Sequence, residues 1–83
     1  MLIRPLILTI KQRQGDIFRG EVEYVTSIND KGRFDVLPEH TNFISLIKDF
    51  IKYKISGGDI KNMKIENAVM RVYESKVDIF LGI

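Results

Sequence analysis

The stretch that decides the fold class reads Gly32-Arg33-Phe34-Asp35-Val36-Leu37-Pro38-Glu39-His40. The glycine at its start permits the positive φ of a hairpin turn, and apolar and charged residues then alternate as in a half-buried strand. Pro38 has no N–H to donate to a neighbouring strand, so regular pairing is expected to stop there. The stretch therefore predicts a turn, a short strand and a polar corner that carries the only histidine.

The same period of two extends toward the N-terminus. Residues 6–10 alternate in the pattern of a half-buried strand, and a turn follows at residues 14–16. In residues 17–25 one face of the predicted strand carries Phe18, Gly20, Val22 and Tyr24. A glycine inside a strand offers no side chain to pack, so Gly20 predicts a bulge or a place where another backbone comes close.

Residues 41–51 fit either a helix or two short strands broken near Lys48-Asp49. We favour strands, because β-branched and aromatic residues dominate and both neighbouring segments are strands. Farther along, a turn at residues 56–59, a break at Glu66-Asn67 and a turn at Glu74-Ser75 separate further alternating runs. The last of these runs is predicted to face inward with Val77, Ile79 and Leu81. In the runs before it one face is predicted to carry Ile51, Tyr53 and Ile55, then Met63 and Ile65, then Ala68, Met70 and Val72.

Short strands with a turn every few residues are typical of an all-β sandwich or barrel. The sequence predicts one antiparallel β-sandwich or flattened barrel over residues 1–83, with about eight to ten short strands. The 83 residues suffice for a single domain, and the absence of cysteine excludes a disulfide framework. Residues 1–5 are interrupted by Arg4 and Pro5 and lack the apolar core of a signal peptide. No apolar run approaches the ~20 residues that span a bilayer, so we expect a chain that is soluble and cytosolic, or that lies on the cytosolic side of a larger structure.

The sequence offers little for catalysis. Neighbouring side chains in an extended strand point to opposite faces, which separates His40 from Glu39, and no spacing supports Ser45 or Ser56 as a nucleophile for His40. One histidine with scattered carboxylates has no recognised metal-ligand spacing, and Gly57-Gly58 lacks the pattern of a phosphate-binding loop. We therefore expect no catalytic, cofactor-binding or metal-binding residue.

A lysine-rich region leaves one binding function open. Its members are Lys48, Lys52, Lys54, Lys61 and Lys64, with Phe50 and Tyr53 among them. Small β-domains bind RNA or single-stranded DNA with basic strands and aromatic platforms. The net charge of only +2 and the expected position of Tyr53, opposite Lys52, favour a solvated lysine face instead.

Two spaced patterns resemble a known family. Gly15-x-x-Phe18-x-Gly20-x-Val22-x-x-Val25, followed by Gly32-x-Phe34-x-Val36-Leu37-Pro38-x-His40, is similar to the N-terminal β-sandwich domain of the ε subunit of F-type ATP synthase, called δ in mitochondria. The sequence departs from that family at Asp35 and Glu39, where glycine is usual, and at Thr41-Asn42, where Ala-Pro is usual.

The resemblance implies a non-catalytic rotor subunit on the cytoplasmic side of the membrane, which couples the γ shaft to the c-ring during proton-driven ATP synthesis. It places a face of the sandwich along γ, and it places the c-ring near six residues, namely Asp30, Lys31, Gly32, Arg33, His40 and Asn42. ATP sensing and inhibition of hydrolysis belong to a C-terminal helical hairpin of the family, so we expect no direct nucleotide binding by residues 1–83. Besides the nucleic-acid interpretation, a free-standing adaptor sandwich with another protein partner is the alternative.

Overall fold

The computed structural model describes residues 4–82; residues 1–3 and 83, at the ends of the predicted domain, lie outside the described part. The strands are β1 (Leu6–Gln12), β2 (Gly15–Asn29), β3 (Gly32–Val36), β4 (Phe43–Ile55), β5 (Ile60–Tyr73) and β6 (Lys76–Leu81). Residues 4–82 contain no helix, and hence none long and apolar enough to cross a membrane. The all-β fold class is confirmed, and residues 43–55 form a strand as favoured over a helix.

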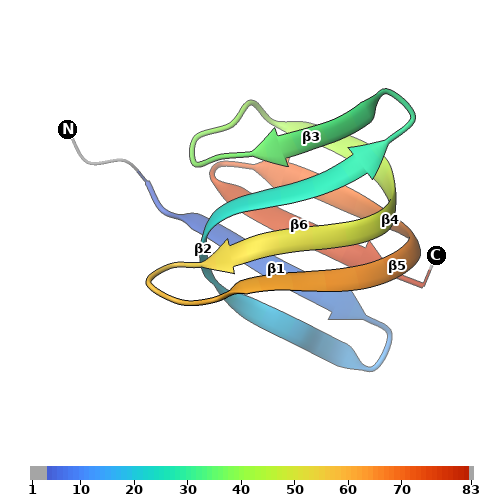
Figure 1. Ribbon diagram of the computed structural model, residues 1–83, viewed down its shortest axis with the longest axis horizontal. Coiled ribbons are helices and arrows are strands. Elements are labelled where there is room, and N and C mark those ends of the chain that lie inside the picture. The colour runs from blue at the N-terminus through green and yellow to red at the C-terminus, as the bar shows by residue number, and fades with distance from the viewer. Residues whose placement is uncertain (1–3, 83) are drawn as a thin grey trace.

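Five of the strands form a closed ring. The pairing order is β1-β6-β5-β4-β2, and β2 pairs back to β1, while β3 extends the sheet from β2. The expectation of purely antiparallel pairing is wrong at one place, because β1 and β6 run parallel (Figure 1). Strand directions alternate around an antiparallel ring, and an odd number of strands cannot complete that alternation. One parallel pair is therefore a consequence of closure.

The predicted number of strands is wrong: residues 4–82 form six, because the expected breaks at Lys48-Asp49 and Glu66-Asn67 face each other at a bulge between two longer strands. Lys48 of β4 pairs with Asn67 of β5 and Asp49 pairs with Ile65, which leaves Glu66 as an extra residue on β5. A bulge bends a strand and increases its twist. Both β4 and β5 consequently curve from the front layer of Figure 1 to the layer behind it.

Gly20 has a different role from the one predicted. It pairs regularly with Leu8, and the bulge nearby falls on Ile17, which the register between β1 and β2 skips. A Cβ atom built on Gly20 would lie 3.1 Å from the ring of Phe18. An aromatic ring, rather than another backbone, therefore occupies the space that the missing side chain leaves.

A bulge in β2 also corrects the predicted face of Tyr24. Val22 pairs with Ile55 and Tyr24 pairs with Lys54, so the register skips Glu23 and the inward-facing phase moves by one residue. Val25 is buried in the core, and Tyr24 lies beside Lys54 on the outer side. Alternation alone cannot reveal such a shift, because an inserted residue changes the phase of every residue after it.

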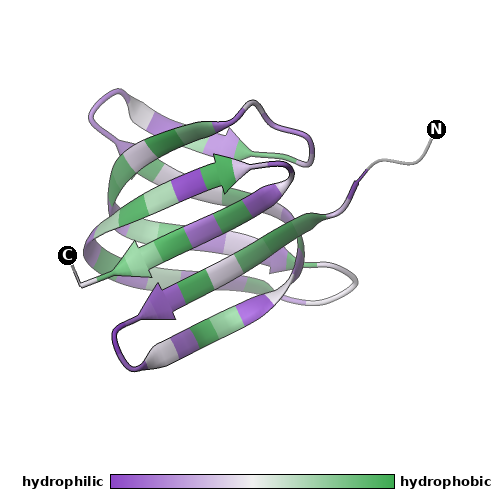
Figure 2. Ribbon diagram, turned by 180° about the vertical axis from the view of Figure 1, so that it is seen from behind, coloured by the Kyte–Doolittle hydropathy of each residue, from purple (hydrophilic) through white to green (hydrophobic). Residues whose placement is uncertain are grey.

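The core lies between the two layers, and its hydropathy pattern is visible as bands along the strands in Figure 2. The faces predicted for the strands after residue 51 are confirmed, because the apolar residues that share each face lie in the core or pack against it. The buried apolar residues are Leu6, Leu8, Ile10, Val22, Val25, Val36, Ile47, Ile51, Tyr53, Ala68, Met70, Val72, Val77 and Ile79.

Two tight turns meet at the end of β3. Regular pairing stops after Val36, as Pro38 predicts, and Glu39 adopts a φ of 63°. In the turn between β5 and β6, Ser75 has a φ of 60° and its hydroxyl oxygen accepts a hydrogen bond of 2.8 Å from the Glu39 N–H. This left-handed conformation is unfavourable for a residue with a Cβ and free of that cost for glycine.

Replacing Glu39 with glycine is expected to raise the melting temperature. The left-handed conformation costs a non-glycine residue about 1–2 kcal/mol, and the added flexibility of the unfolded chain offsets about 0.5–1 kcal/mol of the gain. Thermal unfolding followed by circular dichroism measures the change. Glu21→Gly is the matched control, because Glu21 pairs regularly with Ile7 and should lose stability. Equal decreases in melting temperature in both variants would contradict the interpretation that the positive φ of Glu39 costs stability.

The buried phenol of Tyr53 predicts a loss of stability at high pH. Its exposed fraction is 6%, its ring lies 4.8 Å from that of Phe18, and burial raises the pKa of Tyr53 above the ordinary 10.0. The folded protein therefore holds the phenolic proton more tightly than the unfolded chain does. The stability due to this difference is complete below pH 10 and is lost as the pH rises through the folded pKa. Melting temperatures between pH 8 and 11 should fall less in Tyr53→Phe than in the original chain.

Candidate interaction surfaces

The side chains considered for metal binding or catalysis have other contacts among the described residues. Among residues 4–82 no three side chains of the types His, Cys, Asp and Glu are placed to hold a metal ion. The Nδ1 atom of His40 lies 2.8 Å from the Thr41 carbonyl oxygen, and its ring lies 5.2 Å from that of Phe43. The Ser45 hydroxyl donates to the Leu46 carbonyl and accepts from Asn29, so neither side chain contacts the other within this part of the chain.

The six residues that the resemblance places against the c-ring fall into two groups. Asp30 and Lys31 form the turn between β2 and β3, where the Lys31 N–H donates a 2.9 Å hydrogen bond to the Asn29 side chain. Gly32 and Arg33 begin β3, whereas His40 and Asn42 follow its other end. The length of β3 separates the groups by about 17 Å at the usual rise per residue. The structure therefore does not bring them together at one end of the molecule.

The side chains of the second group have partners within the fold. The Asn42 side-chain oxygen accepts a 3.1 Å hydrogen bond from the Glu74 N–H, which ties the loop after β3 to the turn between β5 and β6. His40 packs on Phe43, which in turn packs edge-on against Phe34 at 5.9 Å. These contacts give His40 and Asn42 a clear structural role.

An apolar strip crosses the outer face of the layer that contains β1 and β6. It consists of Ile44 and Leu46 on β4, Val69 on β5 and Phe80 on β6, and the register places Leu46, Val69 and Phe80 side by side. Ile44 and Leu46 are 71% and 66% exposed. Two large aliphatic side chains this exposed on a sheet face contribute little to the core and are suited to a partner surface.

A polar rim borders the apolar strip. Arg71, which pairs with Ile44, donates a 2.8 Å hydrogen bond to the carboxylate of Asp78. This bond raises the pKa of Arg71. The guanidinium also lies 4.6 Å from the ring centroid of Tyr73, and the ammonium of Lys11 lies 5.4 Å from that of Phe80. An apolar centre with arginine and tyrosine at its border has the composition of a protein-binding surface.

Sequence reasoning missed the apolar strip. Its signal is the run Phe43-Ile44-Ser45-Leu46-Ile47, in which both phases of the alternation carry large apolar residues. Only one phase is needed for the core, as the burial of Ile47 and the exposure of Leu46 show. A strand that is apolar in both phases beside strands with polar outer faces indicates a second, external apolar surface.

The described residues thus form a closed β-fold whose outer face carries a rimmed apolar strip. The chain belongs to the family of the ATP synthase delta/epsilon chain, β-sandwich domain, whose model matches residues 5–81. The resemblance drawn from the glycine, phenylalanine and proline positions is confirmed.

Two ATP synthase epsilon chains are similar to this chain in sequence, in agreement with the family. The chain is 33% identical over 79 residues to an ATP synthase epsilon chain of Wolinella succinogenes, covering 94% of this chain and 60% of that one. It is also 33% identical over 72 residues to an ATP synthase epsilon chain of Nitratiruptor sp., covering 86% and 56%. The chain thus spans little more than half the length of these relatives.

Solved structures share the fold at low sequence identity. A chain of the Euglena gracilis mitochondrial ATP synthase, solved as an OSCP/F1/c-ring assembly, superposes with a TM-score of 0.86 at 21% identity, over 98% of this chain and 53% of that one. A chain of the Tetrahymena thermophila mitochondrial ATP synthase central stalk and c-ring gives 0.79 at 7% identity, over 96% and 65%.

Adjacent substitutions test whether the apolar strip lies outside the core. Leu46→Ala should lower the free energy of unfolding by less than about 1 kcal/mol, because the side chain is mostly in water already. Ile47→Ala, one residue along and buried, should cost about 2–5 kcal/mol or prevent folding. Urea titrations followed by circular dichroism measure both, and equal costs would show that Leu46 belongs to the core.

Proposed function

We propose that this chain forms the β-sandwich part of a rotor subunit in a rotary F-type ATP synthase, where it couples the γ shaft to the c-ring without catalysing a reaction. The observation that carries the proposal is the exposed apolar strip on the rigid closed ring of a member of the delta/epsilon family. The proposed place of action is the cytoplasmic side of the membrane, as a peripheral part of the complex. Family membership favours this role over the nucleic-acid and free adaptor interpretations.

The γ shaft is the proposed partner of the apolar strip. A coupling subunit has to remain attached while torque passes through it, and burial of Ile44, Leu46 and Phe80 against one surface would supply a non-directional, lasting attraction. The Arg71–Asp78 pair and Lys11 would then set the orientation of the partner at the rim.

The c-ring is the proposed partner of the turn between β2 and β3. Asp30 and Lys31 are exposed in the turn at one end of the sheet, and Gly32 and Arg33 follow at the start of β3, so the charges of the turn can meet polar loops. The proposal separates these four from His40 and Asn42, which lie beyond the other end of β3 and hold that loop in place. Direct nucleotide binding by residues 4–82 forms no part of the proposed role.

Co-purification with the γ subunit from the same source tests the role. The original chain should form a complex with γ that survives gel filtration, and Ile44→Lys combined with Leu46→Lys should weaken it at least about tenfold, since charges would enter an apolar contact. Ile60→Lys is the control, because Ile60 is also an exposed aliphatic residue but lies outside the apolar strip. If a folded γ subunit does not bind the original chain, the proposal is refuted. If Ile60→Lys weakens γ binding as much as the double variant does, the apolar strip is not the γ-binding surface.

A further inference from the structure

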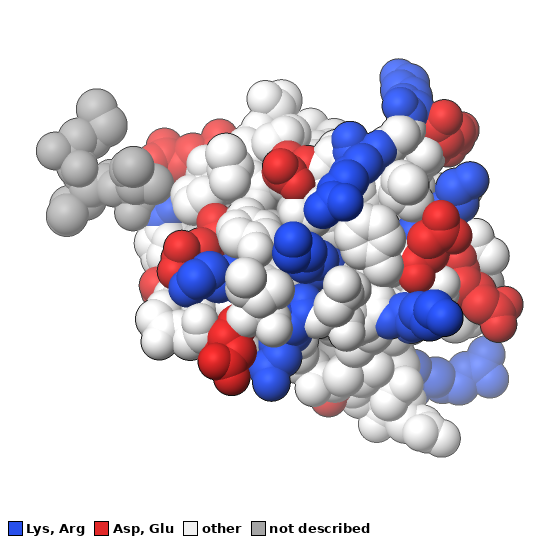
Figure 3. All heavy atoms as spheres, viewed as in Figure 1, with Lys and Arg blue, Asp and Glu red and all other residues white. Residues whose placement is uncertain are grey.

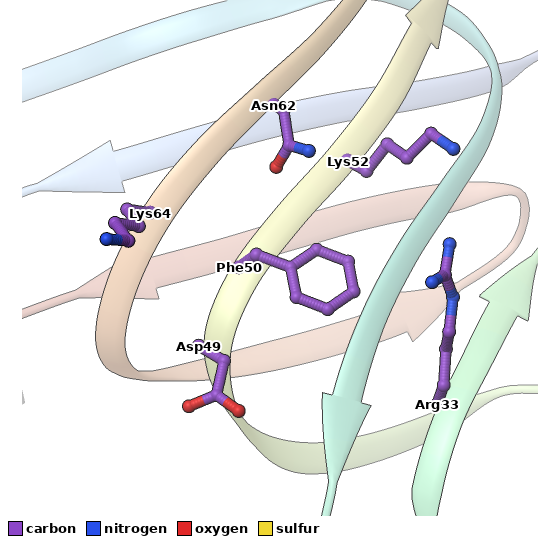
Figure 4. Close-up of a pocket in the computed structure, with 6 residues that line it drawn as sticks. All are labelled: Arg33, Asp49, Phe50, Lys52, Asn62 and Lys64. Carbon is purple, nitrogen blue, oxygen red and sulfur yellow. The ribbon is translucent and has the colours of Figure 1, made fainter.

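The second outer face carries basic side chains grouped around one aromatic ring. Lys52 and Phe50 of β4 lie next to Asn62 and Lys64 of β5, and Arg33 of β3 reaches toward the same ring from the other side (Figure 4). With Asp49 these residues line a shallow depression of about 730 Å³. In Figure 3, which shows this side of the molecule, Lys and Arg lie across the middle of the face. Arg33, Phe50, Lys52 and Lys64 are called the basic platform below.

The cations of the basic platform have no carboxylate partner in the described residues. The ion pairs within residues 4–82 join Lys54 to Glu23 and Arg71 to Asp78, and neither pair includes a member of the platform. Asp35, two residues after Arg33 on β3, accepts a 2.6 Å hydrogen bond from the Thr26 hydroxyl. Arg33 lies over the ring of Phe50, and Lys52 and Lys64 line the same depression together with one carboxylate, that of Asp49. Three cations against one carboxylate leave a net positive local potential that an anionic group would relieve.

Backbone strain lies at the edge of the same depression. Asp49, which lines it, has a φ of 73° and sits opposite the bulge at Glu66. A non-glycine residue in this conformation stores energy, and such residues are concentrated at binding sites. Directly after Asp49, Phe50 lies on the outer face, and its carbonyl oxygen accepts a 2.8 Å hydrogen bond from Ser27.

We infer that the basic platform binds an acidic, Asp- or Glu-rich segment of a neighbouring rotor protein, an inference that rests on the proposed function. Carboxylates suit discrete lysine and arginine contacts, and Arg33 offers the planar fork that binds a carboxylate through two hydrogen bonds. Arg33 also belongs to the turn proposed to face the c-ring, so the platform continues that surface across the sheet.

A nucleic acid is the less suitable ligand for three reasons. The guanidinium of Arg33 lies 5.4 Å from the ring centroid of Phe50 and covers the aromatic face on which a base would stack. Among the residues that line the depression Phe50 alone is aromatic, so it offers no row of rings on which successive bases could stack. The net charge of +2 is also small for a protein that binds polyanions.

A titration of the ¹⁵N-labelled chain with hexaglutamate, followed by NMR, tests the inference without any rotor partner. The backbone amides of Arg33, Phe50, Lys52 and Lys64 should shift most. The double variant Lys52→Gln/Lys64→Gln should weaken binding about fivefold, whereas Lys11→Gln/Lys76→Gln, with the same loss of charge on the other face, should weaken it less than about twofold.

Three outcomes of this titration overturn the inference. No shift at millimolar hexaglutamate would show that the platform has no affinity for carboxylates. Equal effects of the two double variants would show only general attraction between charges. Tighter binding of a twelve-residue oligothymidylate at the same salt concentration would identify a nucleic acid as the ligand. Hexaglutamate binding together with failure to bind γ would retain the site and refute the rotor role, so the two results are separable.

Discussion

The pairing of the first strand with the last is the constraint on which the rest of the structure depends. β1 and β6 lie side by side in parallel, and Leu8 with Val77 and Ile10 with Ile79 are buried on the inner side of that pair. Without it, both strands would present a free edge and the ring would open into a sheet with exposed backbone groups. The pair also joins residues about seventy positions apart, so the ring is complete only when nearly the whole chain has folded.

The bulges let this closed ring adopt two layers. A regular strand cannot turn a corner, whereas the extra residues Ile17, Glu23 and Glu66 bend β2 and β5 locally and move the inward phase. Strain accompanies the same geometry at Asp49 and at Glu39, both of which hold a positive φ. The strained residues thus cost free energy of folding where the chain changes direction, and the packing of the core that the ring encloses offsets this cost.

The sequence predicted most of the strands, because alternation reports directly which residues are buried. It failed where one inserted residue changes the phase, at Tyr24, and where a bulge resembles a strand end, at Lys48-Asp49 and Glu66-Asn67. Closure and its parallel pair involve residues distant in sequence, which local patterns do not record. The surfaces were the least predictable: alternation explains why Ile47 is apolar and says nothing about why Leu46 is. The positions of His40 and Asn42 relative to the turn at Asp30 likewise depend on the direction of β3.

The two outer faces differ in chemistry, and that difference agrees with the proposed role of coupling two partners. The apolar strip offers burial of Ile44 and Leu46, which salt weakens little, while the basic platform offers contacts of Lys52 and Lys64 that salt screens. β4 contributes to both faces, with its first half on one layer and its second half on the other. A force applied to one face therefore reaches the other through a continuous hydrogen-bonded strand. For such a part stiffness is the required property, and a closed ring provides it because no strand of the ring can separate without breaking hydrogen bonds on both of its sides.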